Sequence, residues 1–225
     1  MRVRSLHSWD VTPKEAVALQ RKLASQVETG PPLGEVELVA GADISYNRFS
    51  STIYAGVVVV RLTSGEVIER RGVVTKTAFP YVPGLLSFRE APAVLDAFAM
   101  LKQKPDAVLL DGQGYAHPRR VGLASHVGLW LKLPCVGCAK SRLIGEFKPP
   151  KIAAGSWSDL IDKGEVIGRV VRTKKAVNPL FISVGHKIDL ESAVRLTLAA
   201  CRGYRVPEPT RQAHIFVNEL RSKRR

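Results

Sequence analysis

One short apolar run limits the possible folds of this chain more than any other feature. The segment "PDAVLLDGQG", residues 105–114, contains four consecutive apolar residues that are followed directly by Asp111. A continuous apolar run is typical of a strand that is buried on both faces. Residues 122–133, "GLASHVGLWLKL", indicate a helix, and residues 134–140, "PCVGCAK", indicate a second short buried strand. This order predicts an α/β fold in which the two buried strands are parallel.

Antiparallel strands are predicted ahead of this region. Three strand-like runs cover residues 36–47, 54–63 and 67–77, and the turn "TSGE" joins the last two, which indicates a meander. A helix that Thr12 caps precedes these strands, and a helix over residues 90–102 follows them. The order of three antiparallel strands, helix, strand, helix and strand matches the ribonuclease H-like architecture, in which a mixed sheet is flanked by helices.

A hairpin and two helices are predicted for the rest of the chain. Residues 166–173 and 179–186 are expected to pair, Asp189 to cap a helix that extends to Gly203, and Thr210 to cap the last helix. No repeat and no change of composition marks a boundary. Residues 1–225 are therefore expected to form one domain that ends in a short basic tail, "RSKRR", at residues 221–225.

The charge of the chain indicates the class of its partner. The formal net charge is +14 at pH 7, which suits a polyanion, nucleic acid first of all. A basic enzyme without such a partner is the alternative. The N-terminus lacks the apolar core of a signal peptide, and no apolar run approaches the ~20 residues that a membrane span needs. We expect a cytoplasmic, monomeric protein that does not bind membranes.

The three cysteines suit a reducing compartment. Cys135 and Cys138 form a C-x-x-C motif, but a zinc ribbon needs a second pair and Cys201 stands alone. A thioredoxin-type motif begins a helix, whereas this one lies in a predicted strand. We interpret these cysteines as small buried residues.

Three carboxylates occupy positions that structure alone does not require. Asp43 lies inside the first strand-like run, where aspartate is depleted. Asp111 follows the buried strand at its carboxyl edge, where open α/β sheets bind ligands, and Glu90 begins the predicted helix between them. Each has a plainer interpretation: Asp43 on a solvated face, Asp111 in a turn, and Glu90 in a capping box with Ser87.

Taken together, the three acids favour a metal site. In the predicted sheet the first strand lies beside the strand that ends at Asp111, and the helix packs across both and brings Glu90 near. Clustered carboxylates raise one another's pKa unless a cation compensates their charge. Oxygen ligands in a partly open site suit Mg²⁺, and Mn²⁺ as its substitute. Because Mg²⁺ also binds substrate phosphates, Asp43, Glu90 and Asp111 predict a phosphodiester hydrolase.

Two further side chains are candidates for the same site. Lys140 follows the second buried strand and is expected at the same sheet edge as Asp111, where a cation can stabilise a phosphate in the transition state. A solvent-exposed strand end is its alternative. His214 lies in the last helix, where Ala213, Phe216, Val217 and Leu220 form the core face and turn it toward a flank. A lone helical histidine is usually structural, so only the carboxylates make it a catalytic candidate.

A stiff loop lies between the meander and the following helix. In "AFPYVPGLLSFREAP", residues 78–92, Pro80 and Pro83 restrict the backbone on both sides of Tyr81, and Gly84 can adopt a positive φ. The common explanation is a packed turn whose ring folds onto the core. The alternative is an aromatic probe that stays extended while it pushes against a ligand.

These segments resemble the endonuclease V family, the deoxyinosine 3′ endonucleases. The resemblance rests on five segments in order, "GADISYN", "PYVPGLLSFREAP", "DGQGYAHPRRVGLASHVG", "CAKSRL" and "AHIFVNELR", and covers about residues 10–220. It implies a ribonuclease H-like fold and Mg²⁺. It also implies hydrolysis of the second phosphodiester bond 3′ to deoxyinosine in DNA, which leaves 3′-hydroxyl and 5′-phosphate ends.

The resemblance also implies roles for single residues. Asp43 and Asp111 would hold the metal, Glu90 and His214 would complete the acidic site around metal and water, and Lys140 would support the phosphate. The segment "PYVP" is similar to the family's wedge, with Tyr81 inserted at the lesion. The expected substrate-binding residues are Pro80, Tyr81, Val82, Pro83, Leu86, Gly112, Gly114, His117, Gly122 and Gly137.

The four glycines and His117 of this set are expected to form the lesion pocket, which would hold the deaminated base. Its glycines allow close approach of the backbone, whose polar groups can recognise the hypoxanthine edge. His117 is expected to contact the flipped nucleotide or its phosphate. Arg119, Arg120 and the basic tail are candidates for phosphate contacts, or else solubilising charge.

Two other functions compete with DNA repair. One is an endoribonuclease that cleaves RNA at inosine, since no residue of the sequence reports on the 2′-hydroxyl. The other is a basic nucleic-acid-binding domain without catalysis. The presence of all five candidate catalytic residues argues against the latter, because a binding module needs none of them.

Overall fold

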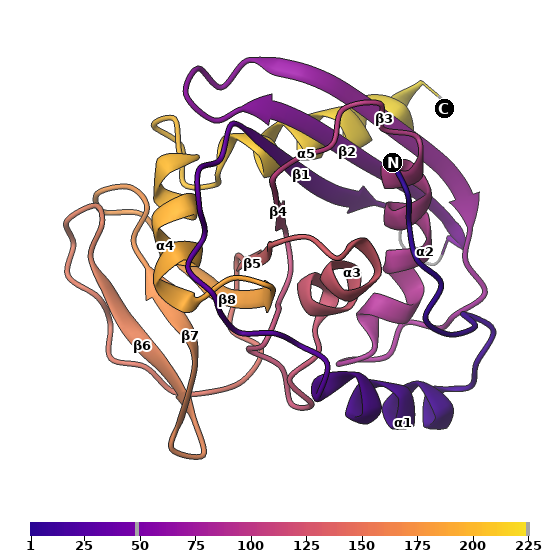
Figure 1. Cartoon of the computed structure of the whole chain (residues 1–225), viewed down its shortest axis with the longest axis horizontal. Coiled ribbons are helices and arrows are strands. Elements are labelled where there is room, and N and C mark those ends of the chain that lie inside the picture. Colours follow the sequence, from indigo (N-terminus) through magenta and orange to yellow (C-terminus); the bar gives the residue numbers. More distant parts are fainter. Residues whose placement is uncertain (48–49, 224–225) are drawn as a thin grey trace.

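An eight-stranded mixed sheet forms the centre of the computed structural model, which describes residues 1–47 and 50–223 (Figure 1). The strand order is β3-β2-β1-β4-β5-β8-β7-β6. The strands are β1 Leu38–Ser45, β2 Thr52–Arg61, β3 Val67–Lys76, β4 Ala107–Leu110, β5 Cys135–Ala139, β6 Trp157–Asp162, β7 Glu165–Val171 and β8 Leu180–His186. Strands β1 to β3 form an antiparallel meander, and β1, β4 and β5 are parallel. The expected ribonuclease H-like mixed sheet is confirmed.

Helices cover both faces of this sheet (Figure 1). They are α1 Pro13–Ala24, α2 Leu86–Ala99, α3 Leu123–Leu131, α4 Leu190–Ala199 and α5 Glu208–Ser222. Helices α2 and α3 pack on one face of β1 and β4, and α4 lies on the other face. Helix α5 packs against β1 and β2. Helix α1 lies outside these layers, where Ala16 meets Phe79 and Phe88.

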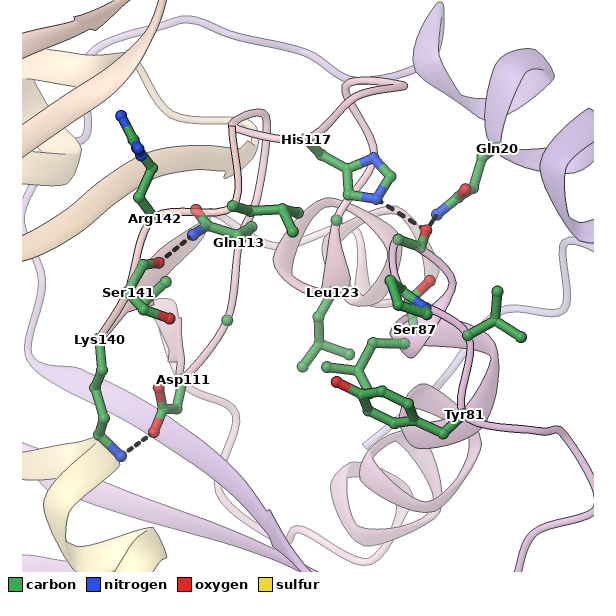
Figure 2. A pocket seen from close by; sticks show the side chains of 18 residues that line it. Gln20, Tyr81, Ser87, Asp111, Gln113, His117, Leu123, Lys140, Ser141 and Arg142 are labelled. Carbon is green, nitrogen blue, oxygen red and sulfur yellow. Dashed lines mark hydrogen bonds and ion pairs between the residues drawn. The ribbon is translucent and has the colours of Figure 1, made fainter. Parts of the chain in front are cut away.

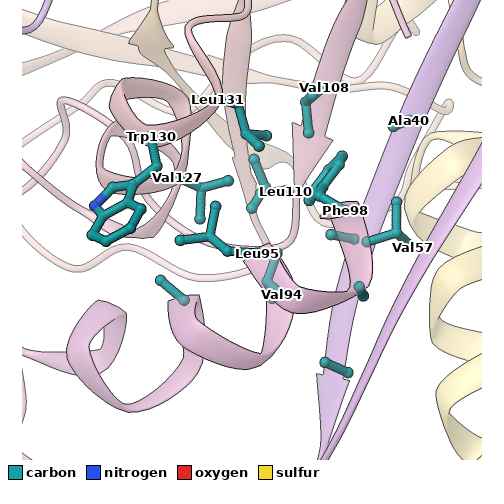
Figure 3. Packing of buried hydrophobic residues seen from close by; sticks show 14 of the residues in the cluster. Ala40, Val57, Val94, Leu95, Phe98, Val108, Leu110, Val127, Trp130 and Leu131 are labelled. Carbon is teal, nitrogen blue, oxygen red and sulfur yellow. The ribbon is translucent and has the colours of Figure 1, made fainter. Parts of the chain in front are cut away.

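The core confirms that the central strand is buried on both faces. Val108 and Leu110 pack against α2 and α3, where Leu95, Phe98 and other apolar side chains interlock (Figure 3). Ala107 and Leu109 belong to the cluster on the opposite face. Full burial of one such large side chain contributes about 1.5–3 kcal/mol, so the strand that ends at Asp111 is held firmly from both sides.

Two helix starts differ from the sequence-based expectation. Helix α2 begins at Leu86 rather than Glu90, and its N-cap Leu85 makes no side-chain cap. The capping box of Ser87 and Glu90 is therefore wrong, and Glu90 lies in the second turn. The motif misleads because it falls inside the helix. The Ser87 hydroxyl instead lies 2.9 Å from Nδ1 of His126.

The last helix shows the same kind of error. Helix α5 begins at Glu208, so Thr210 lies within its first turn and is not the cap. Its hydroxyl donates to the carbonyl of Pro207 at 3.0 Å. Helix α4 has the expected cap Asp189 but ends at Ala199, before Gly203. Two residues of the predicted basic tail, 224–225, lie outside the described residues.

One strand was not predicted. The expected hairpin of β7 and β8 is present, and β6 is added at its edge. Its sequence, "WSDLID", mixes polar and apolar residues and buries only Leu160 fully, so neither alternation nor an apolar run is visible. Pairing with β7 rather than burial makes it a strand.

Cys135 and Cys138 are buried, as expected, whereas Cys201 is half-buried. Cys135 and Cys138 lie in β5 and belong to core clusters on opposite faces of the sheet. Burial raises the pKa of the Cys138 thiol to about 12, which disfavours the thiolate that redox or metal chemistry needs. Among the described residues, none of the helices combines the length and the apolar character needed to cross a membrane.

Candidate active site

The packing of α5 on β1 brings Asp43 and His214 together. Nδ1 of His214 lies 2.7 Å from Oδ2 of Asp43, whose side chain is only 12% exposed. The amide of Asn218 lies 3.2 Å from Nε2 of His214. Because the Asn218 amide donates to Nε2, this ring nitrogen carries no hydrogen. The ring hydrogen therefore lies on Nδ1, which donates it to the Asp43 carboxylate. Ala213 and Val217 are buried, while His214 is exposed on the flank of the helix, as predicted.

Glycines in three strands permit this close packing. A Cβ atom on Gly41 would lie 2.1 Å from the carbonyl carbon of Pro209 at the start of α5. Cβ atoms on Gly56 and Gly72 would meet side chains of α5 at 2.7 and 2.4 Å. Glycine is the residue that lets one backbone approach another this closely. Helix α5 therefore lies directly on the sheet, which fixes the imidazole over the carboxylate of β1.

Asp111 and Lys140 follow the ends of the parallel strands β4 and β5. Leu110 and Gly137 are partners in the register of these strands, so both strands end at the same edge. The ammonium of Lys140 forms an ion pair with the carboxylate of Asp111. The expected proximity of these two residues is confirmed.

Glu90 reaches the same region from α2. Only 6% of the residue is exposed. Burial, and next the nearby carboxylate of Asp43, raise the pKa of Glu90 to about 8. Burial and the charge of Asp111 also raise the pKa of Asp43. The carboxylates therefore disfavour one another's ionisation, as clustered acids should when no cation compensates them.

One cavity of about 320 Å³ contains all three acids and is called the acidic cavity below. Its other lining residues are Ala42, Ile44, Ser45, Tyr46, Leu86, Val94, Leu110 and Leu123. Across residues 1–47 and 50–223, no three His, Cys, Asp or Glu side chains are arranged so that together they could hold a metal ion. Mg²⁺ typically binds through one or two carboxylates and keeps several waters. The cavity is partly open, and the polar side chains that line it offer oxygen atoms only. It therefore fits such an ion.

A second cavity, also about 320 Å³, opens beside the first and is called the loop cavity below. Figure 2 shows Tyr81, Leu123 and His117 on one side of it, and Asp111, Lys140 and Gln113 on the other. Its volume falls within the range of ~300–1,000 Å³ typical of ligand pockets. Leu86, Asp111 and Leu123 line both cavities, so the two spaces share one wall.

Most of the predicted substrate-binding residues line the loop cavity. These are Tyr81, Val82, Pro83, Leu86, Gly112, His117 and Gly122. Pro80 faces a neighbouring cavity between the N-terminal segment and α2. Gly114 and Gly137 instead pack together, since a Cβ on Gly137 would lie 2.5 Å from the Gly114 nitrogen. A side chain at Gly137 would disturb this packing, so its substitution does not report on base recognition alone.

His117 is engaged within the protein. Nε2 of this buried ring lies 2.9 Å from the carbonyl oxygen of Gly84, and Nδ1 accepts from the backbone nitrogen of Arg119 at 3.1 Å. Both ring nitrogens are thus used, and burial lowers the pKa of His117 to about 4. A neutral ring with both nitrogens occupied supports the loop. Because His117 also lines the loop cavity, its contact with the flipped nucleotide or its phosphate stays a prediction.

The ring of Tyr81 does not fold onto the core. It is 65% exposed, while the neighbouring Phe79 is 7% exposed and packs against Phe88. The packed-turn explanation of the loop therefore applies to Phe79 and fails for Tyr81. A stiff loop that presents an exposed aromatic ring beside a cavity can push against a ligand.

Sequence reasoning missed part of the cavity wall. The additional lining residues are Gln20, Gly84, Ser87, Gln113, Leu123, Ala139, Ser141, Arg142 and Leu143. Gln113 lies within the segment "DGQG" after Asp111, so its position was a usable signal. Gln20 has none, because a buried glutamine in α1 is indistinguishable in sequence from one on the polar face of the helix.

Nearly the whole chain is similar in sequence and in fold to known proteins. The sequence model of the family "Endonuclease V" matches residues 21–215. An endonuclease V from Dehalococcoides mccartyi is 51% identical over 220 residues, which are 98% of this chain and 99% of the relative. The crystal structure of endonuclease V from Streptomyces avermitilis has a TM-score of 0.91 and 37% identity, and the match covers 99% of both chains.

A third match is a complex with nucleic acid. It is the Ciona intestinalis endonuclease V with a 24mer DNA that contains an inosine followed by a ribo-adenosine. Its TM-score is 0.83 with 26% identity, and the match covers 94% of this chain and 98% of that chain.

Proposed function

Because the chain belongs to the endonuclease V family and is thus an endonuclease, we propose that it repairs DNA that contains deoxyinosine. In this proposal it hydrolyses the second phosphodiester bond 3′ to the lesion and leaves 3′-hydroxyl and 5′-phosphate ends. The observation that carries the proposal is the wall that the two cavities share, formed by Leu86, Asp111 and Leu123. A base in the loop cavity leaves its 3′ backbone close to the acidic cavity.

The acidic cavity is the proposed metal site. Asp43 and Asp111 are the expected ligands, and Glu90 lies beside them. When bound there, Mg²⁺ or Mn²⁺ would supply positive charge for the phosphate oxygens and a more acidic water. The raised pKa values of Asp43 and Glu90 support this assignment, since both carboxylates gain most from a nearby cation.

In this proposal, side chains around the acidic cavity stabilise charge and transfer protons during hydrolysis. A water molecule loses a proton as its oxygen bonds to phosphorus, the bond between phosphorus and the 3′ oxygen breaks, and that oxygen takes up a proton. Lys140 places positive charge where the phosphate becomes more negative. Glu90, which is buried beside the expected metal ligands, can accept the proton that the water loses. His214 lies on the exposed rim and can pass a proton to solvent while Asp43 orients its ring.

The loop Pro80–Pro83 is the proposed wedge. Taking one base out of the duplex costs a few kcal/mol. An aromatic ring that fills the gap recovers about 1–3 kcal/mol per stacked base. Tyr81 is exposed for this purpose, and the two prolines limit the conformational entropy that the loop loses on insertion. The lesion would then occupy the loop cavity.

RNA is the second candidate substrate. The Ciona intestinalis relative is in complex with DNA in which a ribonucleotide directly follows the inosine, so that protein accepts a 2′-hydroxyl at this place. The same active site would then turn over RNA that contains inosine. Both substrates therefore belong in the first experiment.

That experiment is a nicking assay with purified protein and Mg²⁺. Four labelled strands carry inosine or adenine at one position, in DNA and in RNA. We expect a nick one nucleotide beyond the inosine in DNA, and none with EDTA or with the Asp111→Ala variant. Stronger cleavage of the RNA would change the substrate to inosine-containing RNA.

Matched variants on α2 make the test specific. Glu90→Gln should lower cleavage, whereas Asp96→Asn, which alters an exposed carboxylate of the same helix, should leave it unchanged. Tight binding of all strands without any cleavage would refute the enzyme and favour a nucleic-acid-binding domain.

A further inference from the structure

The carbonyl oxygen of Gly84 accepts hydrogen bonds from three side chains. Nε2 of Gln20 donates at 3.1 Å, Nε2 of His117 at 2.9 Å and Nη2 of Arg119 at 2.7 Å. Figure 2 shows the side chains of Gln20 and His117 converging on one oxygen. A carbonyl oxygen has two lone pairs, so three donors saturate this acceptor and hold it from three side chains.

Gly84 directly follows the wedge. The backbone nitrogen of Leu85 donates to the carbonyl of Val82 at 2.9 Å, which closes a turn with Pro83 and Gly84 at its centre. Gly84 has a φ of +77°, as the third position of a type II turn requires. Because this turn is tight and contains a proline, a displacement of the Gly84 carbonyl would be transmitted to the wedge.

The other end of the wedge is held in a similar way. Nη1 of Arg89 donates to the carbonyl of Phe79 at 2.7 Å, and Nη2 donates to the carbonyl of Ser50 at 3.1 Å. The Phe79 ring is buried. The segment Pro80–Pro83 thus lies between two anchored carbonyl groups, while Tyr81 between them projects into solvent.

We propose that Gln20 and Arg119 are positioning residues of the wedge. With His117 and Arg89 they form a clamp that keeps Tyr81 extended while it displaces a paired base. This inference rests on the proposed function, because it needs Tyr81 to enter the duplex. It also gives α1 a functional role, since Gln20 connects this helix to the loop.

The members of the clamp also hold one another. Gln20 is 1% exposed, and its Nε2 also donates to the carbonyl of Val121 at 2.9 Å. Its Oε1 accepts from Nε of Arg119 at 2.6 Å. A buried amide whose donors and acceptor are all used defines one geometry and rigidifies it. The arrangement therefore keeps the loop in place while Tyr81 pushes a base out of the stack.

Charge alone is a competing explanation for Arg119, because an arginine beside a nucleic-acid site can simply contact phosphate. The two roles predict different substrate dependence. A wedge has most effect where a base must leave a pair, whereas a phosphate contact contributes to duplex and single strand alike. Inosine in duplex DNA and in the same strand without its complement separates them.

The test uses Arg119→Lys and Gln20→Leu in the full-length protein with Mg²⁺. We expect kcat/KM on the duplex to fall about tenfold, as for one lost charge-assisted hydrogen bond. On the single strand we expect less than about a threefold loss. Arg21→Gln is the control, since it removes a neighbouring exposed cation of α1 that makes no bond to Gly84, and it should affect both substrates equally and weakly.

A double-mutant cycle with Tyr81→Ala tests the coupling. In the Tyr81→Ala background, Arg119→Lys should have almost no further effect on the duplex. Additive losses, or equal losses on both substrates, would refute the clamp and leave the nuclease intact. If the Tyr81→Ala variant cleaved the duplex as fast as the unsubstituted protein does, both the wedge and the clamp would be refuted. Cleavage that persists in Asp43→Ala would contradict the proposed function itself.

Fold integrity is checked independently of activity. Gln20→Leu buries an apolar side chain of similar size, and its melting temperature shows whether α1 still packs. Arg119→Lys keeps the charge at a half-buried position, so it tests the clamp even if the Gln20 variant fails to fold.

Discussion

The acidic cavity and the wedge are neighbours that are built in different ways. The carboxylates project from strand β1, from the end of strand β4 and from helix α2, and close glycine contacts hold α5 against β1. The wedge is a loop whose ring is 65% exposed and whose carbonyl groups are held by side chains. Phosphodiester hydrolysis needs groups placed within a fraction of an ångström. A wedge needs exposure, so its stiffness has to come from anchors at its ends.

Loss of a carboxylate should have the largest effect. Asp43→Ala removes a proposed metal ligand and the partner of His214, so we expect single-turnover cleavage to fall by about a thousandfold or more. Binding of an inosine duplex should be kept, because the wedge is untouched. Fluorescence anisotropy with labelled DNA measures it. A variant that binds weakly but still cleaves would reverse the division of roles between the two regions.

A methyl group at Gly41 should destabilise the whole site. The added Cβ would overlap the backbone of Pro209 at 2.1 Å, and overpacking typically costs about 1–3 kcal/mol. For a chain of this size each kcal/mol lowers the melting temperature by ~2–4 °C, so we expect a decrease of up to ~10 °C. Gly34→Ala is the control, since a Cβ there meets no atom within 4 Å. Equal melting temperatures for both variants would contradict the close packing of α5.

Truncation of the wedge should affect activity and leave stability unchanged. Tyr81→Ala loses a stacking contribution of ~1–3 kcal/mol, so cleavage of an inosine duplex should fall by about tenfold to a hundredfold. The melting temperature should stay the same because the ring is exposed. Tyr81→Phe keeps the aromatic face and should retain most activity. A clear loss of stability in Tyr81→Ala would show that the ring is part of the core.

The pH dependence of stability should be smaller and should come from the acidic cavity. The folded protein raises the pKa of Glu90 from 4.5 to about 8 and also raises that of Asp43. Between these two pKa values the folded protein binds more protons than the unfolded chain. The metal-free protein should therefore lose stability as the pH rises from 4.5 to about 8. Thermal melts in EDTA measure this slope.

Two variants and added Mg²⁺ make the measurement of stability against pH specific to the acidic cavity. Glu90→Gln should flatten the slope because the amide does not titrate. Mg²⁺ should raise the melting temperature most at the upper end of the range, where the carboxylates are ionised. This increase should be smaller in the Asp43→Ala/Asp111→Ala variant. An unchanged metal effect there would exclude these residues as ligands.

The sheet and most of the candidate site could be predicted because their signals are local. An apolar run marks the strand before Asp111, strand-like runs joined by a tight turn mark the meander, and an aspartate inside a strand is conspicuous. Once the strand order is known, Asp43, Asp111 and Lys140 must share one edge. Edge strand β6 escaped because its pairing leaves little mark on its composition. The start of α2 escaped because a capping motif lies inside the helix.

By itself, the sequence determined most of the elements, the mixed sheet and the identity of the acidic residues, since periodicity and residue type depend on near neighbours in the chain. Only the tertiary structure decided that Tyr81 points outward, that His117 supports the loop, and that Gln20 reaches Gly84. These contacts join residues 33 to 64 positions apart. Such contacts depend on how packed layers bring distant segments together, and no pattern within a single segment records that.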